Sequence, residues 1–83
     1  MSKVLVEIYL PAARNSFDVY LPLEERLSTV LPVISNLLED LSQGNFKATA
    51  QTLLCNRETG IIYNINLSIY ELQLLNGSKL MLI

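Results

Sequence analysis

The first part of the chain alternates between aliphatic and mixed positions. From residue 3 to residue 10 every second side chain is aliphatic, which is the period of a strand with one buried face. Residues 11–16 are typical of a turn, and a second alternating run covers 17–21. Because Pro22 has no backbone N–H, it is expected to end this run. The pattern therefore predicts a β-hairpin.

The period changes in the next segment, residues 29–42. Apolar side chains recur there at steps of three and four, which is the pattern of an amphipathic helix. The apolar stripe consists of Val30, Ile34, Leu37, Leu38 and Leu41. Ser28 or Thr29 is expected to cap the N-terminus of the helix, and Gly44 to end it.

The part after the helix gives weaker signals. Residues 49–55 are predicted to form a strand, 56–60 a turn, and 61–65 a short second apolar run. The pattern fits an α+β roll, in which one helix packs across one face of a mixed sheet of four to five strands. With 83 residues, the chain has room for one domain, 1–83.

The last residues allow two interpretations. The dipeptide Asn76-Gly77 between apolar runs favours a hairpin that pairs 70–75 with 79–83. In the alternative, 66–77 is an irregular loop that leads into one final strand. Local rules leave both open.

Composition and charge exclude several classes of function. The chain is 51% hydrophobic, but no apolar run approaches the roughly 18 residues of a membrane helix. The N-terminus lacks the pattern of a signal peptide, so a cytoplasmic location is expected. The net charge is −2 and the six cations are scattered, which argues against binding to nucleic acid.

No set of residues indicates catalysis. The sequence contains no His and a single cysteine, Cys55, so no zinc-type ligand set, no cofactor site and no enzymatic activity are expected. Cys55 is interpreted as a small residue of a strand. The neighbouring carboxylates 24–25 and 39–40 are interpreted as solvated charge beside the helix. Tyr70 is expected to anchor its loop through a hydroxyl hydrogen bond.

Short motifs resemble ubiquitin-like proteins. Residues 66–72, Asn-Leu-Ser-Ile-Tyr-Glu-Leu, resemble the loop that precedes the last strand of ubiquitin, and 78–83 resemble that strand. Residues 17–22 and 31–34 resemble more narrowly the YukD/EsaB family, which are stand-alone ubiquitin-like proteins encoded with type VII (WXG-type) secretion systems of Gram-positive bacteria. The resemblance implies a ubiquitin-like β-grasp fold and favours the loop interpretation of the tail.

The resemblance also implies a function. It predicts a non-catalytic, cytoplasmic accessory or regulatory component of a type VII secretion system, with protein partners and no direct insertion into the membrane. A homodimer is a further arrangement to consider. The alternative is a small ubiquitin-like subunit of another assembly, such as a bacterial multicomponent monooxygenase. Because Ile83 belongs to the predicted last strand and no Gly-Gly tail follows it, we expect no conjugation.

The candidate site is an apolar patch on the side of the sheet that faces away from the helix. Leu53 and Leu54 are adjacent, so one of them must face outward, and alignment to the ubiquitin pattern selects Leu54. An aromatic-plus-Met composition is typical of interface cores. The predicted protein-interaction patch consists of Leu5, Tyr9, Tyr20, Leu54, Met81 and Ile83.

Overall fold

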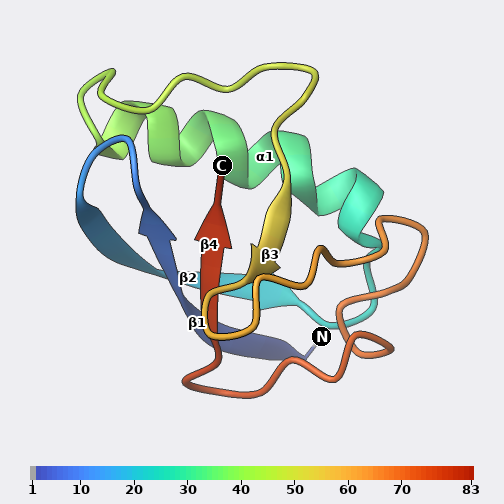
Figure 1. Ribbon diagram of the computed structural model, residues 1–83. Coiled ribbons are helices and arrows are strands. Elements are labelled where there is room, and N and C mark those ends of the chain that lie inside the picture. The colour runs from blue at the N-terminus through green and yellow to red at the C-terminus, as the bar shows by residue number, and fades with distance from the viewer. Residues whose placement is uncertain (1) are drawn as a thin grey trace.

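The chain begins with the hairpin that the alternating pattern predicts (Figure 1). The computed structural model describes residues 2–83. β1 (Lys3–Leu10) pairs with β2 (Asn15–Pro22) in antiparallel register, with Val6 opposite Val19. Buried and partly exposed side chains alternate along β1, so its aliphatic row lies in the core. The local pattern is therefore sufficient for this part of the fold.

The helix α1 (Leu27–Leu41) follows the hairpin and includes the predicted apolar stripe. Val30, Ile34 and Leu38 are buried. Leu37 and Leu41 of the predicted stripe remain exposed, because the buried face of the helix is narrower than its apolar stripe.

The N-terminus of α1 is capped by a distant segment. The predicted cap at Ser28 or Thr29 is wrong, because the N-cap residue is Arg26 and its side chain makes no capping hydrogen bond. The first helical N–H instead donates to the carbonyl of Leu67 at 2.9 Å, and the N–H of Ser28 donates to that of Ile65 at 2.8 Å. The first backbone N–H groups of a helix have no acceptor within the helix, and here these two bonds replace a side-chain cap as their partners.

The C-terminus of α1 ends as Gly44 predicts. Gln43 and Gly44 adopt left-handed conformations, with φ of 56° and 80°. The N–H of Gly44 donates to the carbonyl of Glu39 at 3.0 Å, so the reversal of the chain satisfies a carbonyl of the last helical turn.

The strand predicted over 49–55 is mostly a turn. The N–H of Thr49 donates to Oγ1 of Thr52 at 2.9 Å, and the N–H of Thr52 donates back to the carbonyl of Thr49 at 3.2 Å. Only β3 (Leu54–Asn56) is extended. The apolar run 61–65 forms no strand of its own and contributes one isolated bridge, from Ile62 to β3.

The final strand excludes the C-terminal hairpin, one of the two interpretations of the tail, and agrees with the loop interpretation. β4 (Lys79–Leu82) lies parallel to β1 and antiparallel to β3, in a sheet of order β2-β1-β4-β3. Asn76-Gly77 turns against β1: the N–H of Leu5 donates to Oδ1 of Asn76, and the N–H of Gly77 donates to the carbonyl of Leu5, both at 2.8 Å. Gly77 has φ of 87°, which favours glycine.

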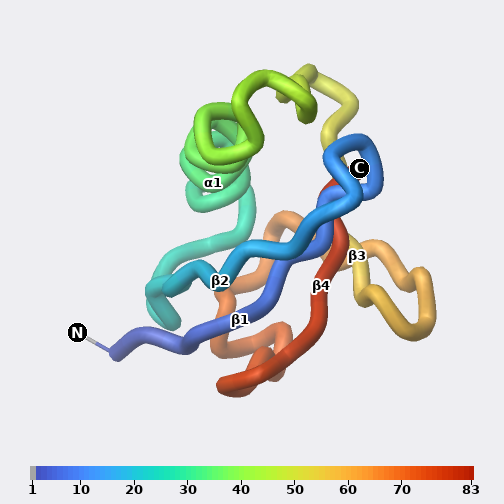
Figure 2. The backbone as a smooth tube through the Cα atoms, turned by 90° about the vertical axis from the view of Figure 1, so that its left-hand side faces the viewer, coloured from blue at the N-terminus to red at the C-terminus, as the bar shows by residue number. Residues whose placement is uncertain are grey.

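The helix covers one face of the four-stranded sheet, and the other face is left without a helix (Figure 2). The long segment between β3 and β4 is held by Ile69 and Leu74, both buried in the same core as α1. Full burial of one such aliphatic side chain contributes about 1.5–3 kcal/mol. The architecture is the predicted α+β roll, a mixed sheet with one helix across it.

Candidate protein-interaction face

The side of the sheet that faces away from α1 carries residues from neighbouring strands in register. Tyr9 of β1 lies opposite Met81 of β4, and Leu5 of β1 lies opposite Tyr20 of β2. Because paired residues of adjacent strands point to the same face, these side chains share one surface.

Leu53, and not Leu54, is the leucine on this surface. Leu54 pairs with Leu82, and both side chains lie in the core, Leu54 being only 1% exposed. Leu53 is 37% exposed and exchanges two backbone hydrogen bonds with Ile83, of 2.8 and 3.0 Å. The prediction that Leu54 faces outward is therefore wrong. The pairing with β4 sets the register, and a shift of one residue reverses the two side chains.

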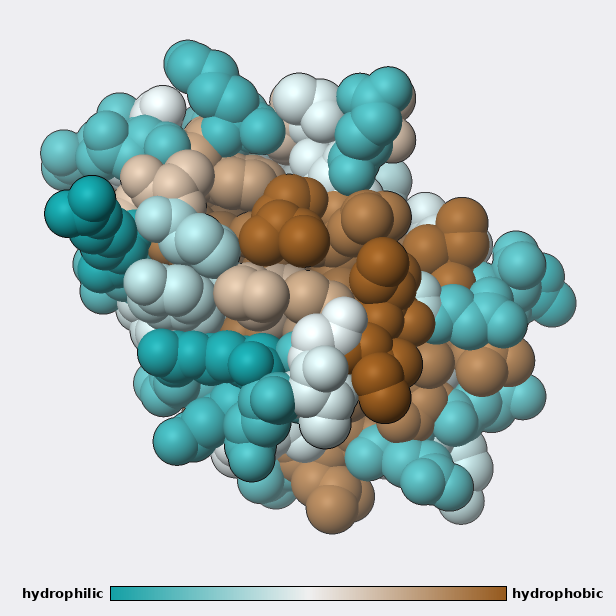
Figure 3. Space-filling view, viewed as in Figure 1, coloured by the Kyte–Doolittle hydropathy of each residue, from teal (hydrophilic) through white to brown (hydrophobic). Residues whose placement is uncertain are grey.

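The remaining predicted residues keep their outward orientation. Leu5, Tyr9 and Met81 are partly exposed, whereas Tyr20 and Ile83 are exposed. In the view in which the strands lie in front of α1, apolar side chains gather near the middle of the molecule (Figure 3). We define the outer face by the six residues Leu5, Tyr9, Tyr20, Leu53, Met81 and Ile83.

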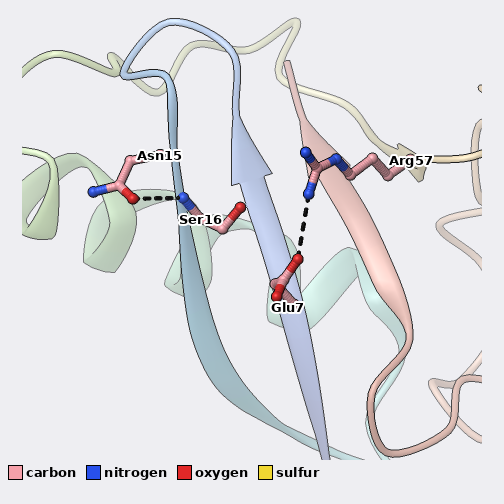
Figure 4. A network of polar contacts seen from close by, with 4 residues as sticks. All are labelled: Glu7, Asn15, Ser16 and Arg57. Carbon is pink, nitrogen blue, oxygen red and sulfur yellow. Dashed lines mark hydrogen bonds and ion pairs between the residues drawn. The ribbon is translucent and has the colours of Figure 1, made fainter.

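A charged pair lies among these apolar side chains. The guanidinium of Arg57 is 3.3 Å from Oε2 of Glu7 (Figure 4). The same guanidinium stacks 4.3 Å from the centre of the Tyr9 ring. Both charged side chains are more than one third exposed, so the ion pair contributes roughly 0–1 kcal/mol. Because Glu7 lies between Leu5 and Tyr9 on β1, the pair separates the outer face into two apolar groups.

The two groups have different compositions. The first lies at the β3–β4 side and contains Tyr9, Leu53, Met81 and Ile83. The second contains Leu5 and Tyr20, at the β2 edge, and Nζ of Lys3 lies 5.9 Å from the centre of the Tyr20 ring.

Cys55 lies on the outer side of the sheet but is covered. It pairs with Met81, is 2% exposed, and its Sγ lies 3.5 Å from the carbonyl oxygen of Met81. Desolvation by burial raises the pKa of the Cys55 thiol above its ordinary value. A buried thiol with a raised pKa is a poor nucleophile, so the structure agrees with the interpretation of Cys55 as a packing residue.

Tyr70 does not anchor its loop. Its side chain is 73% exposed, and no hydrogen bond of its hydroxyl is present among residues 2–83. The neighbouring Ile69 is fully buried, and the backbone N–H groups of both residues donate to carbonyls near the start of α1. The predicted role of Tyr70 is therefore wrong, since a buried aliphatic side chain fixes the loop.

Ser68 and Glu71 complete the anchoring of the loop. The N–H of Ser68 donates to Oε1 of Glu71 at 2.9 Å, and the N–H of Glu71 donates to Oγ of Ser68 at 3.0 Å. These reciprocal bonds resemble a capping box. The bond from the Ser68 backbone, followed by that from its side chain, lowers the pKa of Glu71.

One carboxylate of each acidic pair, 24–25 and 39–40, accepts a hydrogen bond from a backbone N–H, and the two pairs do not converge on a site. Oε1 of Glu24 accepts from the N–H of Ser2, which lowers the pKa of Glu24. Oε1 of Glu39 accepts from the N–H of Ala48 at 2.8 Å. Within residues 2–83, His, Cys, Asp and Glu side chains form no group of three or more that could hold a metal ion. In the same part of the chain, no helix has the length and hydropathy needed to cross a bilayer.

Solved structures with the same fold include secretion proteins. The chain superposes on the ubiquitin-like domain of the Mycobacterium tuberculosis type VII secretion system protein EccD1 with a TM-score of 0.82 and 17% identity, covering 100% of this chain and 99% of that one. The EccD5 ubiquitin-like domain from Mycobacterium xenopi gives a TM-score of 0.83 and 19% identity, covering 100% and 94%.

A larger assembly contains a similar unit. A chain of the MycP5-free ESX-5 inner membrane complex matches with a TM-score of 0.74 and 20% identity, covering 100% of this chain and 21% of that one. No protein-family model and no curated protein sequence matches the chain. The comparisons therefore establish the ubiquitin-like β-grasp fold.

Proposed function

We propose that residues 1–83 form one non-catalytic ubiquitin-like module that serves a type VII secretion system as a cytoplasmic accessory or regulatory component. The observation that supports this most is the match, over nearly the full length of both chains, to the ubiquitin-like domain of a type VII secretion protein. The resemblance of residues 17–22 and 31–34 to the YukD/EsaB family points to the same systems. No comparable observation favours the monooxygenase alternative.

The outer face is the surface that we propose for partner binding. Its β3–β4 group combines an aromatic ring, a thioether and aliphatic side chains on adjacent strands, which is a composition common in interface cores. The neighbouring Glu7–Arg57 pair supplies a polar border. A partner that covers this group removes apolar surface from water, which favours binding. Complementary charges opposite the Glu7–Arg57 pair would fix the orientation of the partner.

The test is an affinity pull-down from the native host with two matched variants. In the first variant, Leu53→Lys and Ile83→Lys place two charges on the outer face. In the control, Leu41→Lys and Ile65→Lys place the same charges on exposed apolar positions near the two ends of α1. Circular dichroism checks that both variants remain folded.

The wild type and the control are expected to recover secretion components, such as the membrane ATPase or WXG-type substrates, and the outer-face variant to lose them. Recovery of no secretion component by the wild type would count against the proposed function. Equal recovery by both variants would retain the function but remove the outer face as its binding surface.

A further inference from the structure

A second surface lies at the β2 edge of the sheet, away from the β3–β4 group of the outer face, with which it shares no residue. Tyr20 of the other outer-face group borders it, and its proposed role does not depend on the proposed function. The apolar side chains of α1 cover a wider arc than the sheet buries, so Leu37 of the stripe stays 43% exposed and Val33 beside the stripe stays 66% exposed. Both side chains border a groove between α1 and β2, which lie side by side (Figure 2). The groove has a volume of about 260 Å³. Its lining consists of Val19, Tyr20, Pro22, Glu25, Thr29, Val30, Val33, Ile34 and Leu37.

The strand beside this groove has a free backbone edge. β2 is an edge strand of the sheet, so only β1 pairs with it. The N–H of Leu23 donates to the carbonyl of Ser2, which marks that pair as hydrogen-bonded. Hydrogen-bonded and non-bonded pairs alternate in an antiparallel ladder, so the backbone groups of Asp18 and Tyr20 point away from β1. Among residues 2–83, these groups have no hydrogen-bond partner outside the ladder.

The neighbouring residues limit the free edge to a short window. Pro22 has no N–H to offer, and the N–H of Ser16 already donates to Oδ1 of Asn15 at 2.9 Å (Figure 4). The open window therefore covers 18–20, directly beside the groove. Two residues with outward N–H and C=O groups offer four hydrogen bonds to an added strand.

The charges of this surface select the kind of strand that fits. Within the described chain, Glu25 is the single charged residue in the lining of the groove. Asp18 adds a second carboxylate on the strand itself, where its side chain points to the outer face opposite Glu7. A second copy of this chain would bring its own Asp18 and Glu25 to the shared edge, and like charges in such positions repel. A separate peptide with apolar residues and basic ends matches both the lining and the carboxylates.

We propose that the β2 edge and the α1–β2 groove bind an extended segment of a partner protein, in which alternate apolar side chains are flanked by Lys or Arg. The segment adds a strand beside Asp18 and Tyr20, and its apolar side chains enter the groove against Val33 and Leu37. Backbone bonds give affinity and the groove gives specificity, as in other cases of strand addition.

The experiment uses one synthetic probe, the capped peptide Lys-Val-Ile-Val-Ile-Lys, titrated into the ¹⁵N-labelled chain. The amides of Asp18 and Tyr20 are expected to shift and to exchange more slowly with solvent, because a partner then accepts their hydrogens. The substitution Val33→Glu is expected to raise Kd by about tenfold or more, which corresponds to roughly 1.4 kcal/mol. The matched control is Ile61→Glu, since Ile61 has the same 66% exposure but does not line the groove.

Two further measurements separate the backbone and charge contributions. A peptide that is N-methylated on the residues facing β2 cannot donate to the edge and is expected to lose measurable binding, although its side chains are unchanged. The substitution Glu25→Gln is expected to weaken binding severalfold at low salt and to have less effect at high salt, because salt screens exposed charges.

Several outcomes would overturn the proposal. One is a set of shifts confined to Tyr9, Met81 and Ile83, which would place the peptide on the outer face. Another is an unchanged Kd for the Val33→Glu variant or for the methylated peptide. A third is a shift of the Asp18 and Tyr20 amides with protein concentration alone, together with dimer formation in sedimentation, which would make a second copy the occupant. Absence of binding at millimolar peptide would also reject it.

Discussion

The two faces of the sheet are built from the same strands and both carry apolar residues, but α1 covers only one of them. On the inner face, Leu54 and Leu82 pair with each other beneath α1 and are fully buried. On the outer face, Leu53, just before β3, and Ile83, just after β4, exchange two backbone hydrogen bonds and stay exposed. The difference arises from what covers each face, since the residue types are nearly the same. Apolar character alone therefore does not distinguish a core residue from a candidate binding residue in this chain.

The largest effect expected from this comparison is on stability. The substitution Leu54→Ala removes a buried side chain and should reduce the free energy of unfolding by about 2–5 kcal/mol, because it loses transfer energy and leaves a cavity. The substitution Leu53→Ala, on the adjacent exposed residue, should change it by less than about 1 kcal/mol. Urea denaturation monitored by circular dichroism measures both values. Equal losses for the two variants would show that the register of β3 is different from the one described.

Cys55 gives a second test, because it lies on the outer side of the sheet but is buried. The native thiol should react with a thiol reagent such as DTNB far more slowly than the thiol of the urea-unfolded chain, since both burial and a raised pKa suppress the thiolate. The raised pKa also affects stability. Burial disfavours the thiolate in the folded chain, so the unfolding free energy depends on the protonation of Cys55. This part of the stability is fully present below the pKa of the unfolded thiol, about 8.5, and is lost as pH rises from there through the raised pKa of the folded chain.

The matching measurement compares unfolding free energies at pH 7 and pH 10 for the wild type and the Cys55→Ala variant. The variant should lose less stability over this range than the wild type. Burial also raises the pKa of Tyr63, which contributes a loss of the same sign in both proteins. The Cys55 charge adds to the Tyr63 shift in the wild type alone, so removing Cys55 changes the comparison in the expected direction. A native thiol that reacts as fast as the unfolded one would place Cys55 among the exposed residues of the outer face.

The smallest effect concerns the ion pair that separates the two apolar groups. A double-mutant cycle with Glu7→Gln and Arg57→Gln should give an interaction energy of roughly 0.2–1 kcal/mol, as is usual for exposed pairs. The value should fall when NaCl is raised to 1 M, because the charges are accessible to solvent. A coupling of several kcal/mol that is independent of salt would mean that the outer face is covered in solution, for example by self-association.

Sequence patterns were most informative where a single element contains the relevant information. The strand 3–10 was predicted with the observed bounds, because period-two burial is visible within one strand. The helix was predicted in the right place, but its cap was not, since the carbonyls that accept from its first N–H groups belong to residues 65 and 67. No local rule connects these positions, which are separated by the whole of α1 and β3.

The candidate face shows the same limit. Leu5, Tyr9 and Tyr20 could be placed outward because long alternating runs fix their orientation. Leu53 and Leu54 could not be separated in this way, because β3 has only three residues and its orientation depends on pairing with β4. The groove between α1 and β2 was also missed. The one signal for it in the sequence was the helical stripe at Leu37, which the sheet does not cover.

The sequence by itself determined the hairpin, the helix and the class of fold, because these depend on periodicities within short segments. The tertiary structure alone decided the register of β3, the parallel pairing of β4 with β1, and the free edge beside α1. These features depend on contacts between residues far apart in the chain, and on which apolar surfaces find a partner. In a chain with so many apolar residues, it is these long-range contacts that decide which apolar side chains lie in the core and which remain exposed for binding.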